Sequence, residues 1–280
     1  MHKDDARLQQ LLQRSELADF ATGIRSLLWN TIRLTSRRVA DEAELPLGAS
    51  KIGGNPDLPS DTPWPTWNGH PLPFLAQIRL ADLAPCDPTH ELPHHGMLAF
   101  FYDPSHNEYP IPPERFRVLS YPSSAGLYRA TPTEEPSLCF PPCALTYTSS
   151  VTLPPPESSE LACIGLPMEA FFYPEQPEKL QQAAGAYEEL ITYLDHEEHE
   201  APRHQLLGHP YQIQGDLLQE CVRDTDYQGP PTDWRLLFQL NTDATAEMMW
   251  GDCGAIYFYI LKRDLAARDF SRVHLILQCC

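Results

Sequence analysis

Short runs of apolar residues recur along this chain, and most of them predict β-strands. Two runs near the C-terminus, residues 236–240 and 255–260, are rich in aromatic or aliphatic side chains, as buried strands are. They bracket a polar loop that ends in Trp250-Gly251-Asp252-Cys253-Gly254. Glycine adopts positive φ without strain, so this loop favours a sharp turn. We therefore predict two neighbouring strands.

Similar runs in the first half predict a β-meander. Residues 74–80, 97–102 and 116–119 each read as a strand between turn residues. From residue 120 to 177 prolines recur, and proline disrupts helix interiors and central strands. This span is predicted to be extended coil with edge strands such as 144–151.

Two stretches carry the helical period instead. Residues 4–34 place leucines, Phe20 and Ile24 at intervals of one helical face, which predicts one long amphipathic helix or two short ones with a weak point at Gly23. Residues 178–199 repeat apolar positions every three or four residues before Pro202. This second helix is predicted to bridge two β-rich parts.

Several markers of the first half recur in the second half in the same order. At nearly constant spacing, the pairs are Gly54-Asn55-Pro56 with Gly208-His209-Pro210, Leu75-Ala76-Gln77-Ile78 with Leu237-Phe238-Gln239-Leu240, Gly96 with Gly254, and Val118 with Val273. An ordered set of this kind indicates duplication of one β-rich unit. A cleft between two such units is a natural binding place.

The predicted fold class is therefore α+β, an internal duplication of two similar antiparallel-sheet units. Its parts are an N-terminal helical segment (1–44), a first repeat with a Pro-rich extension (45–177), the bridging helix (178–202) and a second repeat (203–280). Together they are expected to form one compact domain.

Many short motifs agree in order with one known family. KIGGNPDLP, FLAQIRLADL, GMLAFFYD, HQLLGHP, LLFQLNTD, MWGDCGAIYFYI and RDLAARDFSRV make residues 45–280 resemble the bacterial YwqG-like family of domains of unknown function. The resemblance implies an α+β fold with internal duplication, and it transfers no catalytic residue. Some relatives are encoded beside secreted antibacterial toxins, which implies an immunity role for part of the family.

Charge and composition narrow the set of partners. The 280 residues are 42% hydrophobic, enough for a real core, and carry a net charge of −18. An acidic body repels nucleic acid and anionic membranes and attracts basic proteins. No apolar h-region follows Met1, no apolar run approaches the roughly 18 residues of a membrane span, and the cysteines lack framework spacing. These features predict a cytoplasmic protein with reduced thiols.

The sequence offers little catalytic chemistry. His90-Glu91-Leu92-Pro93-His94 matches H-E-x-x-H formally, but Pro93 breaks the helix that this zinc motif needs. His196 and His199 lie near a helix end without a well-spaced third ligand. Serine-elbow, phosphate-loop and dinucleotide-turn motifs are missing. We predict no catalytic residue, no metal and no cofactor.

The candidate binding residues are Gln77, Gln239, Trp250, Asp252 and Trp64. Gln77 and Gln239 are amides inside apolar strands at matching places, and a buried amide must find partners for its donors and its acceptor. They line a shared polar site, or each caps a neighbouring Gly-Asn-Pro or Gly-His-Pro turn. The tryptophans are partner anchors or lids on the core.

From these features we expect a non-catalytic protein that binds another macromolecule, with its acidic surface directed to a basic partner. The most specific form is an immunity protein that neutralises a cognate toxin. The alternative is a small-ligand-binding protein or hydrolase that uses the cleft between the repeats. A deep pocket with convergent carboxylates would distinguish the alternative from a flat acidic face without them.

Overall fold

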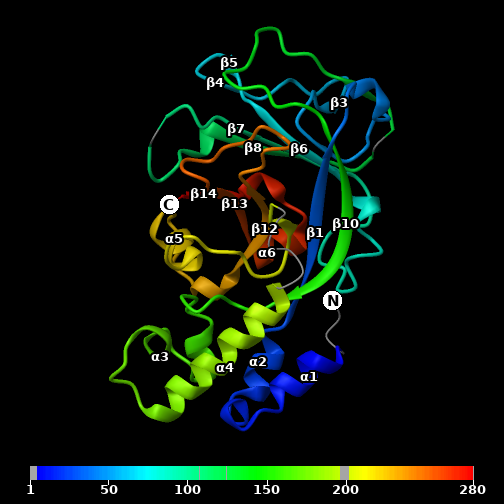
Figure 1. Ribbon diagram of the computed structural model, residues 1–280. Coiled ribbons are helices and arrows are strands. Elements are labelled where there is room, and N and C mark those ends of the chain that lie inside the picture. Colours follow the sequence, from blue (N-terminus) through cyan, green and yellow to red (C-terminus); the bar gives the residue numbers. More distant parts are fainter. Residues whose placement is uncertain (1–4, 107, 124, 196–201, 280) are drawn as a thin grey trace.

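A computed structural model describes residues 5–106, 108–123, 125–195 and 202–279. It is a mixed α/β protein dominated by one large antiparallel sheet (Figure 1). In spatial order the ten strands are β14 (His274–Gln278), β13 (Ala255–Leu261), β12 (Trp234–Asn241), β11 (His204–Leu206), β1 (Trp29–Arg38), β10 (Cys143–Thr152), β2 (Lys51–Ile52), β6 (Phe74–Arg79), β7 (Met97–Tyr102) and β8 (Phe116–Tyr121).

The long strands β1 and β10 lie at the centre of this sheet. They pair antiparallel over their full length, from Trp29 opposite Thr152 to Arg38 opposite Cys143. Outward from β10 the order is β2, β6, β7 and β8, and outward from β1 it is β11, β12, β13 and β14. The sheet curls until β8 meets the 3-10 helix η7 (Phe270–Arg272), so that it is nearly closed.

The curl encloses the main core. Phe100 on β7 packs against Phe238 on β12 and Phe258 on β13, with ring centroids 4.7 and 5.0 Å apart. All three side chains are fully buried. Strands from the two ends of the sheet therefore share one apolar interior. Burial of this apolar surface is the main stabilising contribution to the fold.

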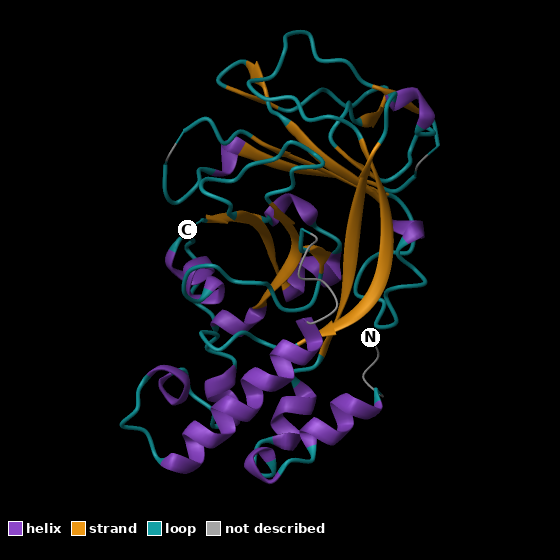
Figure 2. Cartoon of the chain, viewed as in Figure 1, coloured by secondary structure: helices purple, strands orange, loops and turns teal. Residues whose placement is uncertain are grey.

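Six α-helices are seen among the described residues, and four of them form a separate lobe below the sheet (Figure 2). That helical lobe has its own core, in which Leu8 and Leu12 of the first helix pack with Tyr187 and Leu190 of the fourth. The helices are α1 (Ala6–Leu12), α2 (Ala21–Ser26), α3 (Glu169–Phe172), α4 (Glu178–Asp195), α5 (Leu217–Arg223) and α6 (Lys262–Ala267).

The remaining elements are short. Two small sheets pair β3 (Asp57–Pro59) with β9 (Leu127–Arg129) and β4 (Thr66–Trp67) with β5 (His70–Pro71). Further 3-10 turns are η1 (Ser15–Leu17), η2 (Glu42–Glu44), η3 (Leu80–Asp82), η4 (Pro113–Arg115), η5 (Leu161–Ile164) and η6 (Pro231–Asp233). No helix of the described ranges has the length and apolar character that crossing a bilayer demands.

Most predicted elements are present, and one prediction needs correction. The N-terminal helical pattern gives two short helices but ends at Ser26, and residues 29–34 belong to β1. β-branched Thr31 and Ile32 favour the strand there. The stretch 144–151 forms a strand, as predicted: it pairs with β1 along its whole length and with β2 only at Ala144, so most of it has a ladder partner on one side. The neighbouring prolines, Pro142 and Pro154, lie outside β10.

Candidate functional site

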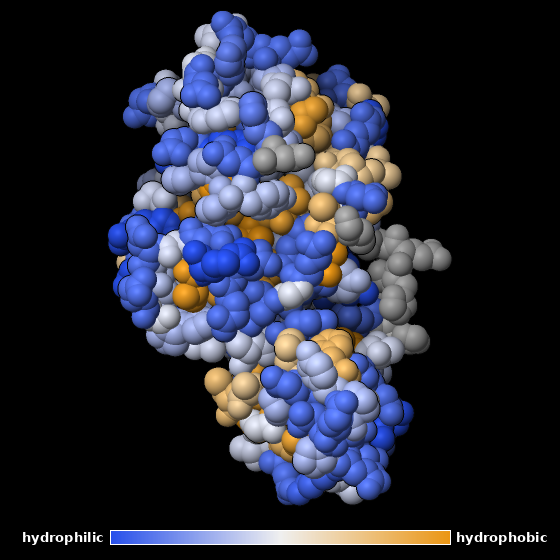
Figure 3. Space-filling view, turned by 90° about the vertical axis from the view of Figure 1, so that its left-hand side faces the viewer, coloured by the Kyte–Doolittle hydropathy of each residue, from blue (hydrophilic) through white to orange (hydrophobic). Residues whose placement is uncertain are grey.

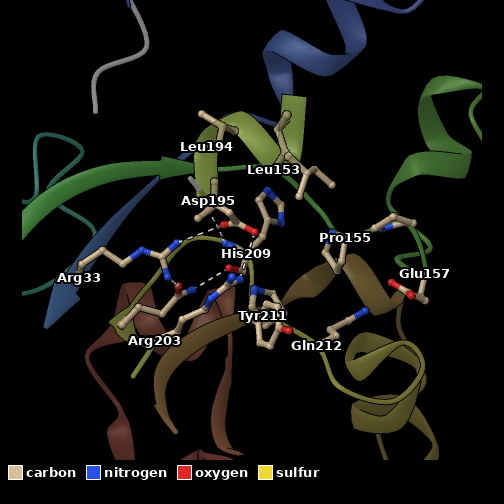
Figure 4. Close-up of a pocket in the computed structure, with 15 residues that line it drawn as sticks. Arg33, Leu153, Pro155, Glu157, Leu194, Asp195, Arg203, His209, Tyr211 and Gln212 are labelled. Carbon is tan, nitrogen blue, oxygen red and sulfur yellow. Dashed lines mark hydrogen bonds and ion pairs between the residues drawn. The ribbon is translucent and has the colours of Figure 1, made fainter. Parts of the chain in front are cut away.

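An open pocket of about 220 Å³ lies where the sheet meets the helical lobe (Figure 4). We call it the junction pocket. Its walls come from β1, from the chain that leaves β10 at Thr152, from the C-terminal end of α4, and from residues 203–212 around β11. Segments far apart in the sequence thus build it, and it lies beside the central strand pair.

Strand alternation places the first arginine in the junction pocket. Ile32 and Leu34 of β1 point into the main core, so Arg33 between them points to the opposite face. Arg33 lies directly opposite Gln205 of β11 and donates a hydrogen bond from Nη1 to its Oε1. Arg33 is only 6% exposed, so its position is fixed by packing as well as by this bond.

A second arginine meets the first through one carboxylate. Arg203, just before β11, has Nη1 3.1 Å from Oδ2 of Asp195, and Nη2 of Arg33 lies 3.9 Å from the other oxygen. Asp195 ends α4, where the helix dipole disfavours a negative charge, and the two guanidinium groups offset that cost. Arg203 also lies 4.0 Å above the ring of Tyr211. One acid therefore serves two cations.

The floor of the junction pocket is the turn Gly208-His209-Pro210. Gly208 has φ of +73°, and a Cβ there would meet Thr31 and Thr152 atoms at 2.7 Å, so only glycine fits. The backbone N–H of His209 donates to Oγ1 of Thr152 at 2.8 Å. The turn is thereby bound to the last residue of β10, and Thr31 of β1 donates to the carbonyl oxygen of Leu207 just before the turn.

The His209 imidazole is held between two oxygen acceptors. Nδ1 lies 3.1 Å from Oε2 of Glu160, and Nε2 lies 2.8 Å from the carbonyl oxygen of Leu27. Both ring nitrogens therefore face oxygen acceptors. The ring also stacks on Trp29 at 4.0 Å, and Arg235 covers the other side of Trp29 at 3.6 Å.

Electrostatics keep Glu160 ionised. Burial by itself would raise the pKa of this carboxyl group, but the adjacent charge and hydrogen bond of His209 outweigh it. Arg235 and Lys262 add to that effect, and the pKa of Glu160 lies below its ordinary value. A buried carboxylate therefore lies directly behind the His209 side of the pocket.

The opposite side of the junction pocket is apolar. Leu153, Pro155, Pro156, Ile191 and Leu194 line it. Figure 4 places Glu157, the other acid on the wall, on the side away from Arg33. The pocket thus joins a cationic end to a hydrophobic side.

The junction pocket carries few hydroxyl groups. Its only hydroxyl groups are those of Thr152, which accepts from the His209 N–H, and Tyr211, and neither lies in a nucleophile–base pair among the described contacts. One polar group on the wall has spare capacity, because Nε2 of Gln212 is buried and finds no partner among the described residues. Nor does the part of the chain that is described contain a group of three metal-ligating side chains.

The two repeated glutamines hold two turns. Oε1 of Gln77 accepts from the N–H of Asp57 at 2.7 Å, and Oε1 of Gln239 accepts from the N–H of Tyr211 at 3.0 Å. Both glutamines are fully buried. We call the turn Gly54-Asn55-Pro56-Asp57 with its partners the first corner, and Gly208-His209-Pro210-Tyr211 with its partners the second corner. These bonds correspond to the alternative in which each amide caps a turn.

The other candidate residues lie apart from one another. Trp250 is 1% exposed in the main core, and Trp64 is half-buried beside Phe101 with its indole N–H bonded to the carbonyl of Leu72. Asp252 is exposed in the loop before β13. None of the five candidates lines the junction pocket, although His209 and Pro210 on its wall belong to the repeated Gly-x-Pro turn.

The histidine motifs have separate outcomes. His90 and His94 lie in an irregular loop with ring nitrogens 3.0 Å apart, as the proline in the motif predicts. His196 and His199 lie outside the described residues. The bridging helix that precedes them is confirmed from Glu178 to Asp195.

The junction-pocket residues left a weak signal in the sequence. Arg33 interrupts the apolar pair Ile32 and Leu34, which is the alternation of a half-buried strand. Its partner Gln205 lies 172 residues further along the chain, so no local pattern joins the two.

Comparison with known proteins adds a family. Among curated proteins no match to the chain is found. Residues 50–279 match the family model described as a domain of unknown function, DUF1963. The match covers the turns of both corners and every residue that lines the junction pocket except Arg33. The chain belongs to this DUF1963 family.

Proposed function

We propose that this protein acts by binding without catalysis, and that the junction pocket is its site for a small ligand. One observation carries the proposal. Arg33 and Arg203, from separate segments, converge with Tyr211 on an open pocket of about 220 Å³. A concave, largely apolar site with a few convergent polar groups is the usual form of a ligand site.

A blocked pocket tests this function. Ile191→Trp places a large ring in the junction pocket from α4, and Leu47→Trp adds the same ring at a side chain that is 55% exposed. A metabolite library is then screened for compounds that raise the melting temperature. We expect hits that stabilise the wild type and Leu47→Trp but not Ile191→Trp. A screen without any Ile191-dependent hit would contradict the proposal.

A second candidate function is the binding of a basic protein. It is favoured by an exposed tip on the helical lobe, where Met168, Phe172 and Tyr173 are 39%, 51% and 52% exposed. Glu169 and Glu175 lie in the same segment. Figure 3 shows apolar side chains among hydrophilic ones on the surface of this lobe. Apolar anchors within an acidic rim fit a partner with basic residues.

In its most specific form this candidate is a cytoplasmic immunity protein that neutralises an antibacterial toxin. A toxin gene from the same genomic neighbourhood would be co-expressed with the wild type, with Phe172→Ser/Glu169→Lys, and with the control Glu134→Lys/Glu135→Lys. Growth rescue by the wild type and the control, but not by the tip variant, is the expected result. Failure of every neighbouring toxin to be neutralised would contradict the immunity role.

We also infer that the two ends of the sheet derive from a duplication and that the chain is a YwqG-like member of its family. The strand order outward from β1 and from β10, and the matching bonds of Gln77 and Gln239, support the duplication. Under this proposal the junction pocket lies where the two repeats meet.

A further inference from the structure

The occupant of the junction pocket can be inferred by comparing the two corners. Tyr211 follows its proline at the second corner as Asp57 does at the first, and each donates its N–H to the matching glutamine. The strand residues also correspond, since Lys51 lies opposite Gln77 and Gln205 lies opposite Gln239. The corners therefore share a backbone arrangement and differ in side chains.

The first corner contains its own carboxylate. Asp57 is fully buried and accepts from Nε2 of Gln77 at 2.8 Å, from the N–H of Gly48 at 2.9 Å and from Nε of Arg129 at 2.9 Å. Nζ of Lys51 lies 3.7 Å from the same carboxylate. An internal acid thus occupies the place where cations and amides converge.

The second corner lacks that acid. Tyr211 stands in its place and is 44% exposed. Cations are nevertheless present, because Arg203 lies over the Tyr211 ring and Arg33 lies beside Gln205. Their shared partner Asp195 lies 3.1 Å from Arg203 and 3.9 Å from Arg33, so one carboxylate is divided between two guanidinium groups.

We propose that the junction pocket binds a small carboxylic acid, whose carboxylate meets the Arg33 and Arg203 side while its apolar part packs on Leu153, Ile191 and Leu194. This assignment rests on the proposed function of the pocket as a ligand site. Guanidinium forks match carboxylates geometrically, and Asp195 and Asp57 show that this protein already pairs arginines with carboxylates at both corners.

The apolar wall distinguishes an organic acid from an inorganic anion. Phosphate would meet the arginines but leave Leu153, Ile191 and Leu194 without a partner. An acid with a short branched hydrocarbon uses both sides of the pocket. 4-Methylpentanoate is a suitable probe, and 4-methylpentanamide has nearly the same shape without the charge.

Removing the charge of Asp195 should change the affinity for the acid in the opposite sense to removing an arginine. This carboxylate lies beside the guanidinium groups and repels an incoming anion. Asp195→Asn removes that charge, so it should strengthen binding of the acid. Arg203→Met removes one cation and should weaken it. A loss of fold cannot produce effects of opposite sign on one ligand.

The experiment is an NMR titration of the full chain with 4-methylpentanoate, 4-methylpentanamide and inorganic phosphate. We expect the acid to bind at least about tenfold more tightly than the amide or phosphate. Arg203→Met should weaken the acid by about tenfold or more, and Asp195→Asn should tighten it several-fold. Arg14→Met removes an arginine paired with Glu16 and Glu189 on the helical lobe and should change nothing.

Two results would overturn the assignment. Equal binding of acid and amide, both lost in Ile191→Trp, would leave the pocket as a ligand site but show that it does not select a carboxylate. The absence of binding by all three probes, with Ile191-dependent hits in the library, would reject the carboxylic acid class alone. Absence in both experiments would reject the ligand site as well.

Discussion

The first and second corners share one backbone arrangement, but the first holds a closed, buried ion network and the second borders an open pocket. At the first, Lys51, Asp57 and Arg129 close on one another, and the first two are fully buried. At the second, Tyr211 replaces the acid and the space beside it opens into the junction pocket. The exchange of an internal carboxylate for a partly exposed ring, together with Gln205 at the place of Lys51, therefore accompanies the change from a closed ion network to an open site.

The neighbours of the two glutamines explain why one corner closes. On the first side Lys51 and Gln77 lie in register with Ala144 and Ala99, whose small side chains leave room for the Asp57 network. On the second side Gln205 and Gln239 lie in register with Arg33 and Tyr257, which are large. Side-chain volume along one row of the sheet thus separates the two outcomes.

The largest expected effect on stability comes from removing the buried carboxylate of the first corner. Asp57→Ala removes the carboxylate that neutralises Lys51 and Arg129 in a buried place. We expect the free energy of unfolding to fall by about 3–5 kcal/mol, the usual cost of leaving a buried charge without its partner. Urea unfolding measures it. Asp252→Ala, at an exposed acid, is the control and should stay within about 0.5 kcal/mol.

Replacing the glutamines should also lower the free energy of unfolding, by less than Asp57→Ala does, and by more at Gln77 than at Gln239. Gln77 makes bonds to the Asp57 N–H, the Asp57 carboxylate and the Ala49 carbonyl, whereas Gln239 bonds the Tyr211 N–H and Asn241. Gln77→Leu should cost about 2–3 kcal/mol and Gln239→Leu about 1–2 kcal/mol, because each leaves a different number of groups unsatisfied. Equal losses in urea unfolding would mean that the two corners are energetically alike.

The contribution of the second corner to stability should depend on pH in the acid range. The pKa of Glu160 in the folded protein lies below its ordinary value of 4.5, so the pair with His209 stabilises the fold fully above about pH 4.5. That contribution is lost as the pH falls through the lowered pKa. Glu160→Gln should therefore cost about 1–2 kcal/mol at pH 7, and the difference from the wild type should shrink below pH 4.5.

Urea unfolding at pH 7, 5 and 3.5 checks this pH dependence. Glu157→Gln, at the acid on the far side of the pocket, is the matched control and should show no such trend. A difference for Glu160→Gln that persists unchanged at pH 3.5 would show that the ion pair is not its source.

The smallest effect on stability should come from making the second corner resemble the first. Tyr211→Asp places a carboxylate next to Arg203 at a partly exposed position, and we expect stability to change by no more than about 0.5 kcal/mol. Binding of 4-methylpentanoate should nevertheless fall by about tenfold, because the new acid competes for the guanidinium groups. Tyr211→Asn, without the charge, should retain more of the binding in the same NMR titration.

The sequence by itself determined the elements whose patterns are local. The apolar runs at 74–80, 97–102, 236–240 and 255–260 all form strands, and the three-to-four spacing from residue 178 forms α4. The repeated Gly-x-Pro turns and glutamines were also visible, because each depends on residues close in the chain or on a recurring order. The hydrophobic period and the turn residues are properties of neighbours along the chain.

Only the tertiary structure decided which of these residues meet. Arg33 reads as part of a helical segment until β1 pairs with β11, and Asp195 and Arg203 meet it only when α4 returns to the sheet. The use of the two corners was likewise undetermined, since Asp57 and Tyr211 occupy matching turns with different neighbours in space. Long-range pairing sets the register, and register places side chains on one face, so no local pattern in the linear sequence shows that these residues meet.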